Sequence, residues 1–143
     1  MKNKGFSLVE LIIVIAIMAI LAAAIAPALI RYIDKSRKTD DVAAAETVNT
    51  AVNAALANED AYSDVAASMN GTTSVWTAAA NTAGPTGNTF EQEVTSNLGG
   101  SAPKVKYTKD NNTQWTVYVQ QNGKAIVMKG SVELQPEIDK NYK

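Results

Sequence analysis

The sequence predicts an α+β protein in which a long N-terminal α-helix, apolar and kinked near Pro27, packs its C-terminal half on a small antiparallel sheet of about three strands. Three observations predict this class. An uncharged apolar run fills residues 11–30. After this run, apolar residues recur every three or four positions, which is the spacing of one helix face. Beyond Lys104 they recur at every second position, which is the spacing of a strand.

The apolar run, LIIVIAIMAILAAAIAPALI, is long enough to cross a membrane. A helix of this length extends about 30 Å, which matches the hydrocarbon thickness of a bilayer. Because the run is apolar all round, it also fits an environment of other helices. Three fates are therefore open: a permanent anchor, a cleaved secretory signal peptide, or a helix that later leaves the lipid for a bundle of its own kind.

The flanks of the run bear on the signal-peptide alternative. Lys2 and Lys4 give a basic start, and Ala24-Ile25-Ala26 is a small-x-small cleavage pattern. However, Pro27 would directly follow the cut, and the run exceeds the usual length of roughly 7 to 15 residues. A secreted binding module or enzyme with a signal peptide is thus the more distant alternative.

Glu10 is an ionisable residue at the edge of the apolar run. Burying such a group in a bilayer costs roughly 2.5 to 3.5 kcal/mol at the centre and less near an end. The carboxylate therefore either has a partner or reaches the headgroups on its flexible stem. The residues alone leave both readings open.

Pro27 lies inside the predicted helix. Proline removes one backbone hydrogen bond and clashes with the carbonyl four residues back, near Ala23. We therefore expect a kink or local unwinding, although proline is also common in membrane-spanning helices.

The segment Gly5-Phe6-Ser7-Leu8-Val9-Glu10, followed by the apolar run that contains Pro27, resembles the N-terminal signature of type IV prepilins and of the pseudopilins of type II secretion. The resemblance covers residues 1–30. It implies that residues 1–5 are a leader, cut after Gly5 by a prepilin peptidase, and that Phe6 becomes a methylated N-terminus. It also implies that Glu10 meets the N-terminal amine of a neighbouring subunit during assembly.

The resemblance further implies that residues 6–30 are a transmembrane helix that becomes the core of a filament. The partners would be other copies of the chain, the membrane before assembly, the peptidase, and the pilus assembly platform with its ATPase machinery. The protein would pass from the cytoplasmic membrane to an extracellular surface pilus, and a weakened stretch at Ala22–Ala26 would let the helix stretch or bend there.

Two points within this resemblance depend on charge. Cleavage creates a positive amine in apolar surroundings that a carboxylate can compensate. Since Phe6 and Glu10 are four residues apart, the pair can form within one helix or between subunits. The second point is topology. A count of basic residues would put the C-terminal side in the cytoplasm, since two lysines precede the run and four basic residues follow it: Arg31, Lys35, Arg37 and Lys38. The resemblance instead implies an N-terminus inside, and a long following domain can translocate regardless of its charge.

Residues 31–143 are expected to form one globular head. We predict that the helix continues over 31–60, since an apolar stripe recurs there at helical spacing. Residues 61–102 are rich in Ser, Thr, Asn, Ala and Gly and are predicted to be mostly loop, with a short helix at Phe90–Leu98 and Trp76 buried in the core. The stripe consists of Val42, Ala45, Val48, Val52 and Ala55.

The sheet is expected within 103–143. The alternation of apolar residues predicts strands at Val105–Tyr107, Trp115–Val119 and Ala125–Met128, joined by turns at Asp110–Asn112 and Asn122-Gly123. The predicted core face carries Val105, Tyr107, Trp115, Val117 and Val119. The sequence leaves the tail 131–143 without an assignment.

Composition narrows the function classes. The chain has no cysteine or histidine, which excludes disulfides, the usual Cys/His zinc sites and Ser-His-Asp triads. The C-terminal region must therefore be held by packing and hydrogen bonds, or be mobile. With 13 basic and 14 acidic residues, the net charge of −1 does not favour nucleic-acid binding by the protein as a whole. DNA binding through Lys104, Lys106 and Lys109 stays undecided.

The resemblance implies a structural filament subunit, and the composition excludes the usual catalytic groups, so we expect no enzymatic activity, cofactor, metal or small-molecule substrate. A pseudopilin of a type II secretion or competence system is the alternative. An enzyme would have to use carboxylates such as Glu91 with Glu93, or Asp60 with Asp64, which are more simply solvated loop charges. The sequence leaves open the role of the filament in adhesion, motility, DNA uptake or aggregation.

Overall fold

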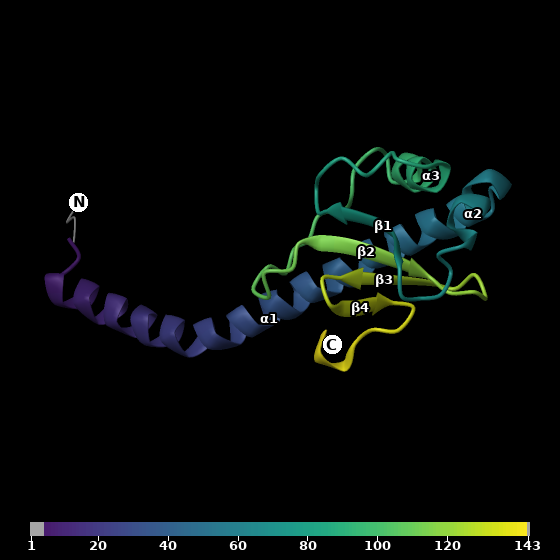
Figure 1. Cartoon of the computed structure of the whole chain (residues 1–143). Helices are drawn as coiled ribbons and strands as arrows, with labels where there is room; N and C mark the ends of the chain where they lie inside the picture. The colour runs from purple at the N-terminus through teal and green to yellow at the C-terminus, as the bar shows by residue number, and fades with distance from the viewer. Residues whose placement is uncertain (1–4, 143) are drawn as a thin grey trace. The chain divides into compact units, whose positions relative to one another are not determined.

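The computed structural model describes residues 5–142. Contacts divide the chain into two units, the first extending to Ser36 and the second comprising Arg37–Lys143. The first helix, α1 (Leu8–Leu56), contributes to both, and the remaining elements in Figure 1 belong to the second. Each unit is described by itself.

The first unit is the N-terminal part of α1. Its large apolar side chains are exposed along its length, and among the described residues α1 is the one helix with the length and composition to cross a membrane. The helix is continuous through Pro27, so residues 22–26 keep helical backbone here. Local unwinding at this site is not seen in the single chain, and the kink stays a prediction.

The end of α1 differs from the predicted helix over 31–60. The helix ends at Leu56, where Ala57 and Asn58 donate to the carbonyls of Ala54 and Ala55 and tighten the last turn. The side chain of Asn58 then accepts from the amides of Asp60 and Ala61 and starts a new helix, α2 (Glu59–Ala66). An N-cap asparagine thus ends the long helix before residue 60.

The head contains a small antiparallel sheet packed on α1, as predicted, with four strands in the order β1-β2-β3-β4 (Figure 1). Each strand pairs with the next along the chain, so the sheet is a meander. The predicted strands at Trp115–Val119 and Ala125–Met128 are confirmed. The four strands are β1 (Ser74–Ala79), β2 (Gln114–Val119), β3 (Ala125–Lys129) and β4 (Val132–Gln135).

The strand predicted at Val105–Tyr107 is wrong. The amides of Lys106 and Tyr107 donate to the carboxylate of Asp41 on α1, at 2.6 and 3.2 Å, instead of entering a strand ladder. Val105 and Tyr107 still pack against the core, but from an irregular segment. A side chain far away in the sequence therefore takes the hydrogen bonds that a sheet would have used.

The edge strand next to β2 comes instead from 61–102, which was predicted to be mostly loop. That stretch contains β1 and most of α2, as well as the predicted short helix, α3 (Thr89–Asn97). In β1 a register shift between Ser74 and Trp76 lets the adjacent Val75 and Trp76 both be buried. Trp76 is 1 % exposed, which confirms the prediction that it belongs to the core.

The tail forms the last strand and the end of the chain. A two-residue turn at Gly130-Ser131 joins β3 to β4, since Lys129 pairs with Val132. Gly130 has φ +58°, a backbone conformation that favours glycine. After β4, a short 3-10 helix, η1 (Lys140–Tyr142), places the side chain of Tyr142 in the core.

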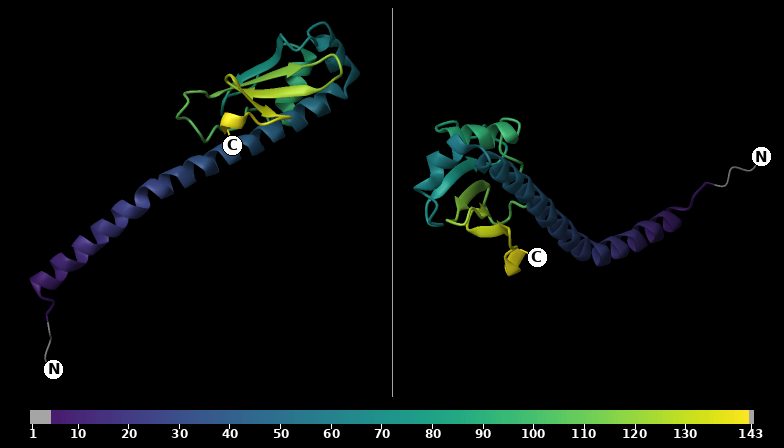
Figure 2. Two further views of the ribbon diagram at one scale, coloured as in Figure 1. Left: turned by 90° about the horizontal axis from the view of Figure 1, so that it is seen from below. Right: turned by 90° about the vertical axis from the view of Figure 1, so that its right-hand side faces the viewer.

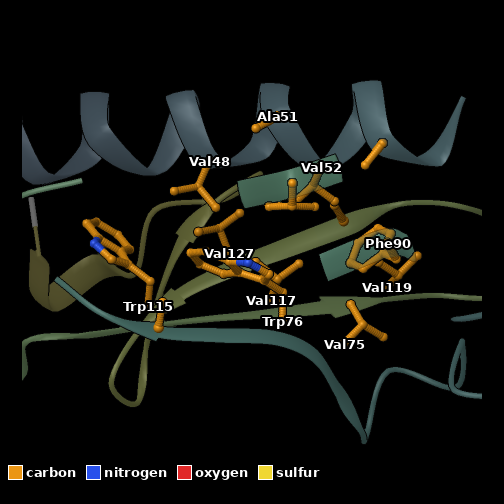
Figure 3. Close-up of a cluster of buried hydrophobic side chains, with 14 of the residues drawn as sticks. Val48, Ala51, Val52, Val75, Trp76, Phe90, Trp115, Val117, Val119 and Val127 are labelled. Atoms are coloured by element: carbon orange, nitrogen blue, oxygen red, sulfur yellow. The ribbon is translucent and has the colours of Figure 1, made fainter. Parts of the chain in front are cut away.

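The core lies between the C-terminal half of α1 and one face of the sheet. Figure 2 shows the sheet along this part of α1 from two further sides, and Figure 3 shows Val48 and Val52 of α1 pointing toward Val117 and Val127. The predicted apolar stripe is confirmed, with Val42 partly buried and its other members buried. Trp115, Val117 and Val119 alternate inward as predicted.

Candidate functional site at the N-terminus

The described residues that precede α1, residues 5–7, are exposed. Gly5, Phe6 and Ser7 precede the helix in non-helical backbone, and the Phe6 side chain is 85 % exposed. A Cβ atom added at Gly5 would meet nothing within 4 Å. The cleavage point that the motif predicts therefore lies in an open segment directly before a helix.

Ser7 and Glu10 form a cap at the start of α1. The amide of Ser7 donates to Oε2 of Glu10 at 2.9 Å, and the hydroxyl of Ser7 accepts from the amide of Val9 at 3.4 Å. The carbonyl of Ser7 accepts the first helical hydrogen bond, from Leu11. This reciprocal arrangement is a variant of the capping box in which the hydroxyl accepts from the second helical amide, that of Val9, instead of the third, and two otherwise unpaired amides find acceptors.

The cap defines the electrostatics of Glu10. Its carboxylate lies in the first turn of α1, where the helix dipole favours negative charge. A carboxylate can accept hydrogen bonds through both oxygens, so the bond to Ser7 leaves acceptor capacity for a further donor. Glu10 is thus held in place by its own helix and remains able to receive a cation.

The predicted site residues fall into two places. Gly5, Phe6 and Glu10 cluster at the start of α1, whereas Pro27 lies well inside the helix. Ser7 adds a hydrogen-bonding role beyond its place in the motif, and the spacing Ser-x-x-Glu before an apolar run is the signal for it. The chain thus carries a self-capped helix start next to an exposed glycine.

The carboxylates considered for an enzyme are engaged in helix and loop structure. Glu91 accepts from the amide of Gly87, Asp64 accepts from the amide of Thr89, and Glu93 accepts from the side chain of Asn58. In residues 5–142 there is no group of three or more His, Cys, Asp or Glu side chains that could hold a metal ion. These three carboxylates therefore act as hydrogen-bond acceptors that hold helix ends and loops in place.

Comparisons with known proteins point to the same N-terminal segment. Residues 1–26 match the family model of the prokaryotic N-terminal methylation motif. The chain is 54 % identical over 54 residues to fimbrial protein Q of Moraxella bovis, covering 38 % of this chain and 34 % of that protein. It is 37 % identical over 65 residues to the type IV major pilin protein PilA of Myxococcus xanthus, covering 46 % of this chain and 30 % of that protein.

A third relative is the type IV major alpha-pilin of Moraxella bovis, 53 % identical over 54 residues, or 38 % of this chain and 34 % of the relative. The chain thus spans about a third of the length of the curated relatives that it matches. No solved structure matches the chain significantly.

The fold and the N-terminal segment together define a class: a protein with a long apolar N-terminal helix and a methylation motif, whose helix packs on a small antiparallel sheet. Within this class, the N-terminal part of the chain carries the methylation motif and is similar in sequence to type IV pilins and a fimbrial protein, which supports a type IV prepilin.

Proposed function

We propose that the chain is the structural subunit of an extracellular type IV pilus. In this proposal a prepilin peptidase cuts after Gly5, Phe6 becomes the methylated N-terminus, and the subunit polymerises through the N-terminal part of α1. The subunit waits in the cytoplasmic membrane, and the assembly platform with its ATPase moves it into the surface filament. The observation that carries the proposal is that the N-terminal part of α1 exposes its apolar side chains and begins inside the residues that match the methylation motif.

The physical argument concerns the exposed apolar surface. Contiguous apolar patches of more than a few hundred Å² are rare on soluble monomers and indicate a surface that is covered by lipid or by protein. The first part of α1 exposes apolar residues all round, so a single docked partner would leave much of it in water. A bilayer before assembly and a bundle of like helices after it both cover the helix completely.

Glu10 supplies the electrostatic part of the proposal. Cleavage after Gly5 would place a positive amine on Phe6, which directly precedes the Ser7 amide that already contacts Glu10. The carboxylate could accept this amine from its own chain or from a neighbouring subunit. The capping box favours an ordered Glu10 in either case, because the Ser7 bond fixes the carboxylate before a partner arrives.

Sequencing the N-terminus of protein sheared from the cell surface tests the proposal. We expect the mature chain to begin at a methylated Phe6 and to lack Lys2 and Lys4, which lowers the formal net charge from −1 to −3. Intact mass spectrometry would show the same loss. Surface material that begins at Pro27 or Ala28 would mean that the apolar helix is discarded as a signal peptide, and the filament proposal would then be wrong.

A pseudopilin of a secretion or competence system is the second candidate, because it shares the N-terminal signature. Electron microscopy of cells that express the protein separates the two. Abundant long surface filaments labelled by an antibody to the head support the pilus subunit, whereas processed protein without such filaments supports the pseudopilin.

A further inference from the structure

A buried ion cluster lies at the point where the head begins on α1. Lys129 at the end of β3 and Asp41 on α1 are both fully buried, and their side chains form an ion pair with Nζ 3.3 Å from Oδ2. Lys129 also pairs with Asp110, at 3.0 Å, and donates to the carbonyl of Tyr107 at 2.6 Å and the hydroxyl of Tyr142 at 2.8 Å. One ammonium therefore connects four separate segments of the chain.

Asp41 connects the same segments through its own contacts. Besides the ion pair, its carboxylate accepts from the hydroxyl of Tyr142 and from the amides of Lys106 and Tyr107. Among the described residues, every buried side-chain nitrogen and oxygen has a hydrogen-bond partner. The cluster thus meets the condition under which buried charges are tolerated, since each is paired and its remaining sites are hydrogen bonded.

Aromatic rings and a second lysine surround the cluster. Tyr107 and Tyr142 meet edge to face, with ring centroids 6.0 Å apart, and Nζ of Lys129 lies 5.2 and 5.0 Å from them. Lys38, one turn before Asp41 on α1, lies 5.1 and 5.3 Å from the same rings and donates to the carbonyl of Asn141. The end of the chain is therefore tied to α1 twice.

The position of the cluster along α1 determines how it would respond to tension. Asp41 is the first buried residue of α1, and the apolar contacts of Ala45, Val48 and Val52 come after it. Tension that enters α1 from its N-terminal part therefore meets the head first at the turn from Lys38 to Asp41, where both side chains contact the cluster. Apolar contacts alone would be lost one after another from this end, whereas the first step at the cluster must break several ion pairs and hydrogen bonds that share the same two charged groups.

We propose that Asp41, Lys129, Asp110 and Tyr142 form a non-covalent lock that fastens the C-terminal segment and the 103–113 segment to α1 and prevents the head from peeling off the helix under tension. The mechanical part rests on the proposed function as a filament subunit. The lock itself is a property of the single chain and can be tested without a filament.

Hydrogen exchange on the full chain in detergent micelles tests the lock. The substitution Lys129→Met keeps the length of the side chain and removes the ammonium. We expect the amides of Lys106 and Tyr107, and those of α1 around Asp41, to exchange at least about tenfold faster, since removing one partner of a buried pair is strongly destabilising. Lys124→Met on the same hairpin is the matched control, because Lys124 is exposed, and it should leave these rates unchanged.

A second variant covers the case in which Lys129→Met fails to fold. The double substitution Asp41→Leu with Lys129→Met replaces the ion pair by apolar side chains and should retain a folded head. It cannot accept from the Lys106 and Tyr107 amides, so these should still exchange at least about tenfold faster than in the unmodified chain. Unchanged rates in the double variant would overturn the lock.

Two further measurements separate this inference from the proposed function. Filaments of Lys129→Met should lose more subunits on shearing than filaments of Lys124→Met, and equal losses would overturn the mechanical role. If the unmodified chain forms no filament while the exchange result holds, the filament proposal fails and the lock stands. An intact mass one water molecule below that of the processed chain would mean that Lys129 has condensed with a carboxylate, and a non-covalent lock would be the wrong description.

Discussion

Tyr142 illustrates at the level of one residue how a buried group couples stability to pH. Burial, together with its hydrogen bond to Asp41 and the negative charges of Asp41 and Asp110, raises the pKa of the Tyr142 hydroxyl well above its ordinary value of about 10. The folded chain therefore keeps this proton at a pH where the unfolded chain loses it.

This raised pKa predicts a loss of stability in alkali. The pKa of Tyr142 is higher in the folded chain than in the unfolded chain. Its contribution to the free energy of unfolding is therefore fully present below about pH 10 and falls as the pH rises beyond it. Chemical denaturation from about pH 9 to about pH 11, on either side of the ordinary tyrosine pKa of about 10, should show a steeper fall in the free energy of unfolding for the unmodified chain than for Tyr142→Phe. Tyr118→Phe, on the outer face of the sheet, serves as the control and should retain the steep fall.

At the scale of the elements, the turn between β3 and β4 contains a glycine, Gly130, whose Cα lies close to the Asn112 side chain. Gly130 has positive φ, and a Cβ atom there would clash with the Asn112 side chain. Gly99 also has positive φ, but a Cβ there would meet nothing within 4 Å. The two glycines share the backbone requirement and differ in the space around them.

Alanine substitutions at the two glycines should therefore have different costs. Gly99→Ala should lower the free energy of unfolding by about 1 kcal/mol, the usual cost of left-handed backbone for a residue with a Cβ. Gly130→Ala should lower it by roughly 1 to 3 kcal/mol more, because Asn112 must also move. Urea unfolding followed by circular dichroism measures the free energy of unfolding of both variants. Equal losses would show that the Asn112 side chain moves aside at no cost.

The elements also show why sequence reasoning succeeded in some places and failed in others. β2 and β3 could be predicted because Trp115, Val117 and Val119 alternate with polar residues, and α3 because Phe90 and Val94 share a face. β1 was hidden, since its SVWTAA segment lies in a Ser, Thr and Ala rich stretch and its bulge breaks the alternation. The segment at Val105 has a strand pattern, but its amides bond to Asp41, an acceptor that no local pattern indicates.

The same distinction holds for the two sites. The motif from Gly5 to Glu10 is contiguous, so its positions could be read directly, and the capping box follows from the spacing of Ser7 and Glu10. The buried cluster could not be found in this way, because Tyr142 and Asp41 lie 101 residues apart in the sequence. Only the fold shows that Lys129 is an inward-facing residue of β3 with carboxylates beside it.

For the whole molecule, the two units differ in how they treat their apolar side chains. The first unit exposes its apolar side chains, whereas the second has its own core between α1 and the sheet. A substitution in the first turn of α1 should therefore leave the folding of the head unchanged, and a defect in assembly from such a change can be assigned to the N-terminal part of the helix.

Glu10→Val tests this division of roles. We expect the variant to insert into the membrane. The free energy of unfolding of its head, measured by thermal unfolding, should stay within about 0.5 kcal/mol of that of the unmodified chain, as for surface changes in general. Filament assembly should be abolished, because the amine of Phe6 would lack its carboxylate partner. Ser7→Ala keeps the carboxylate and loses one capping hydroxyl, so it should assemble. A normal yield of filaments from Glu10→Val, measured by shearing and immunoblotting, would remove the pairing role.

The burial of Tyr142 also guides where foreign peptides can be displayed on this protein. A fusion directly after η1 would pull on a side chain that the core holds, whereas the β2–β3 hairpin loop presents Gln121, Asn122 and Lys124 to solvent. An epitope grafted between Asn122 and Gly123 would extend an existing reversal of the chain and leave the inward-facing residues in register. If the subunit polymerises as proposed, that loop is the insertion point from which to build a multivalent vaccine carrier.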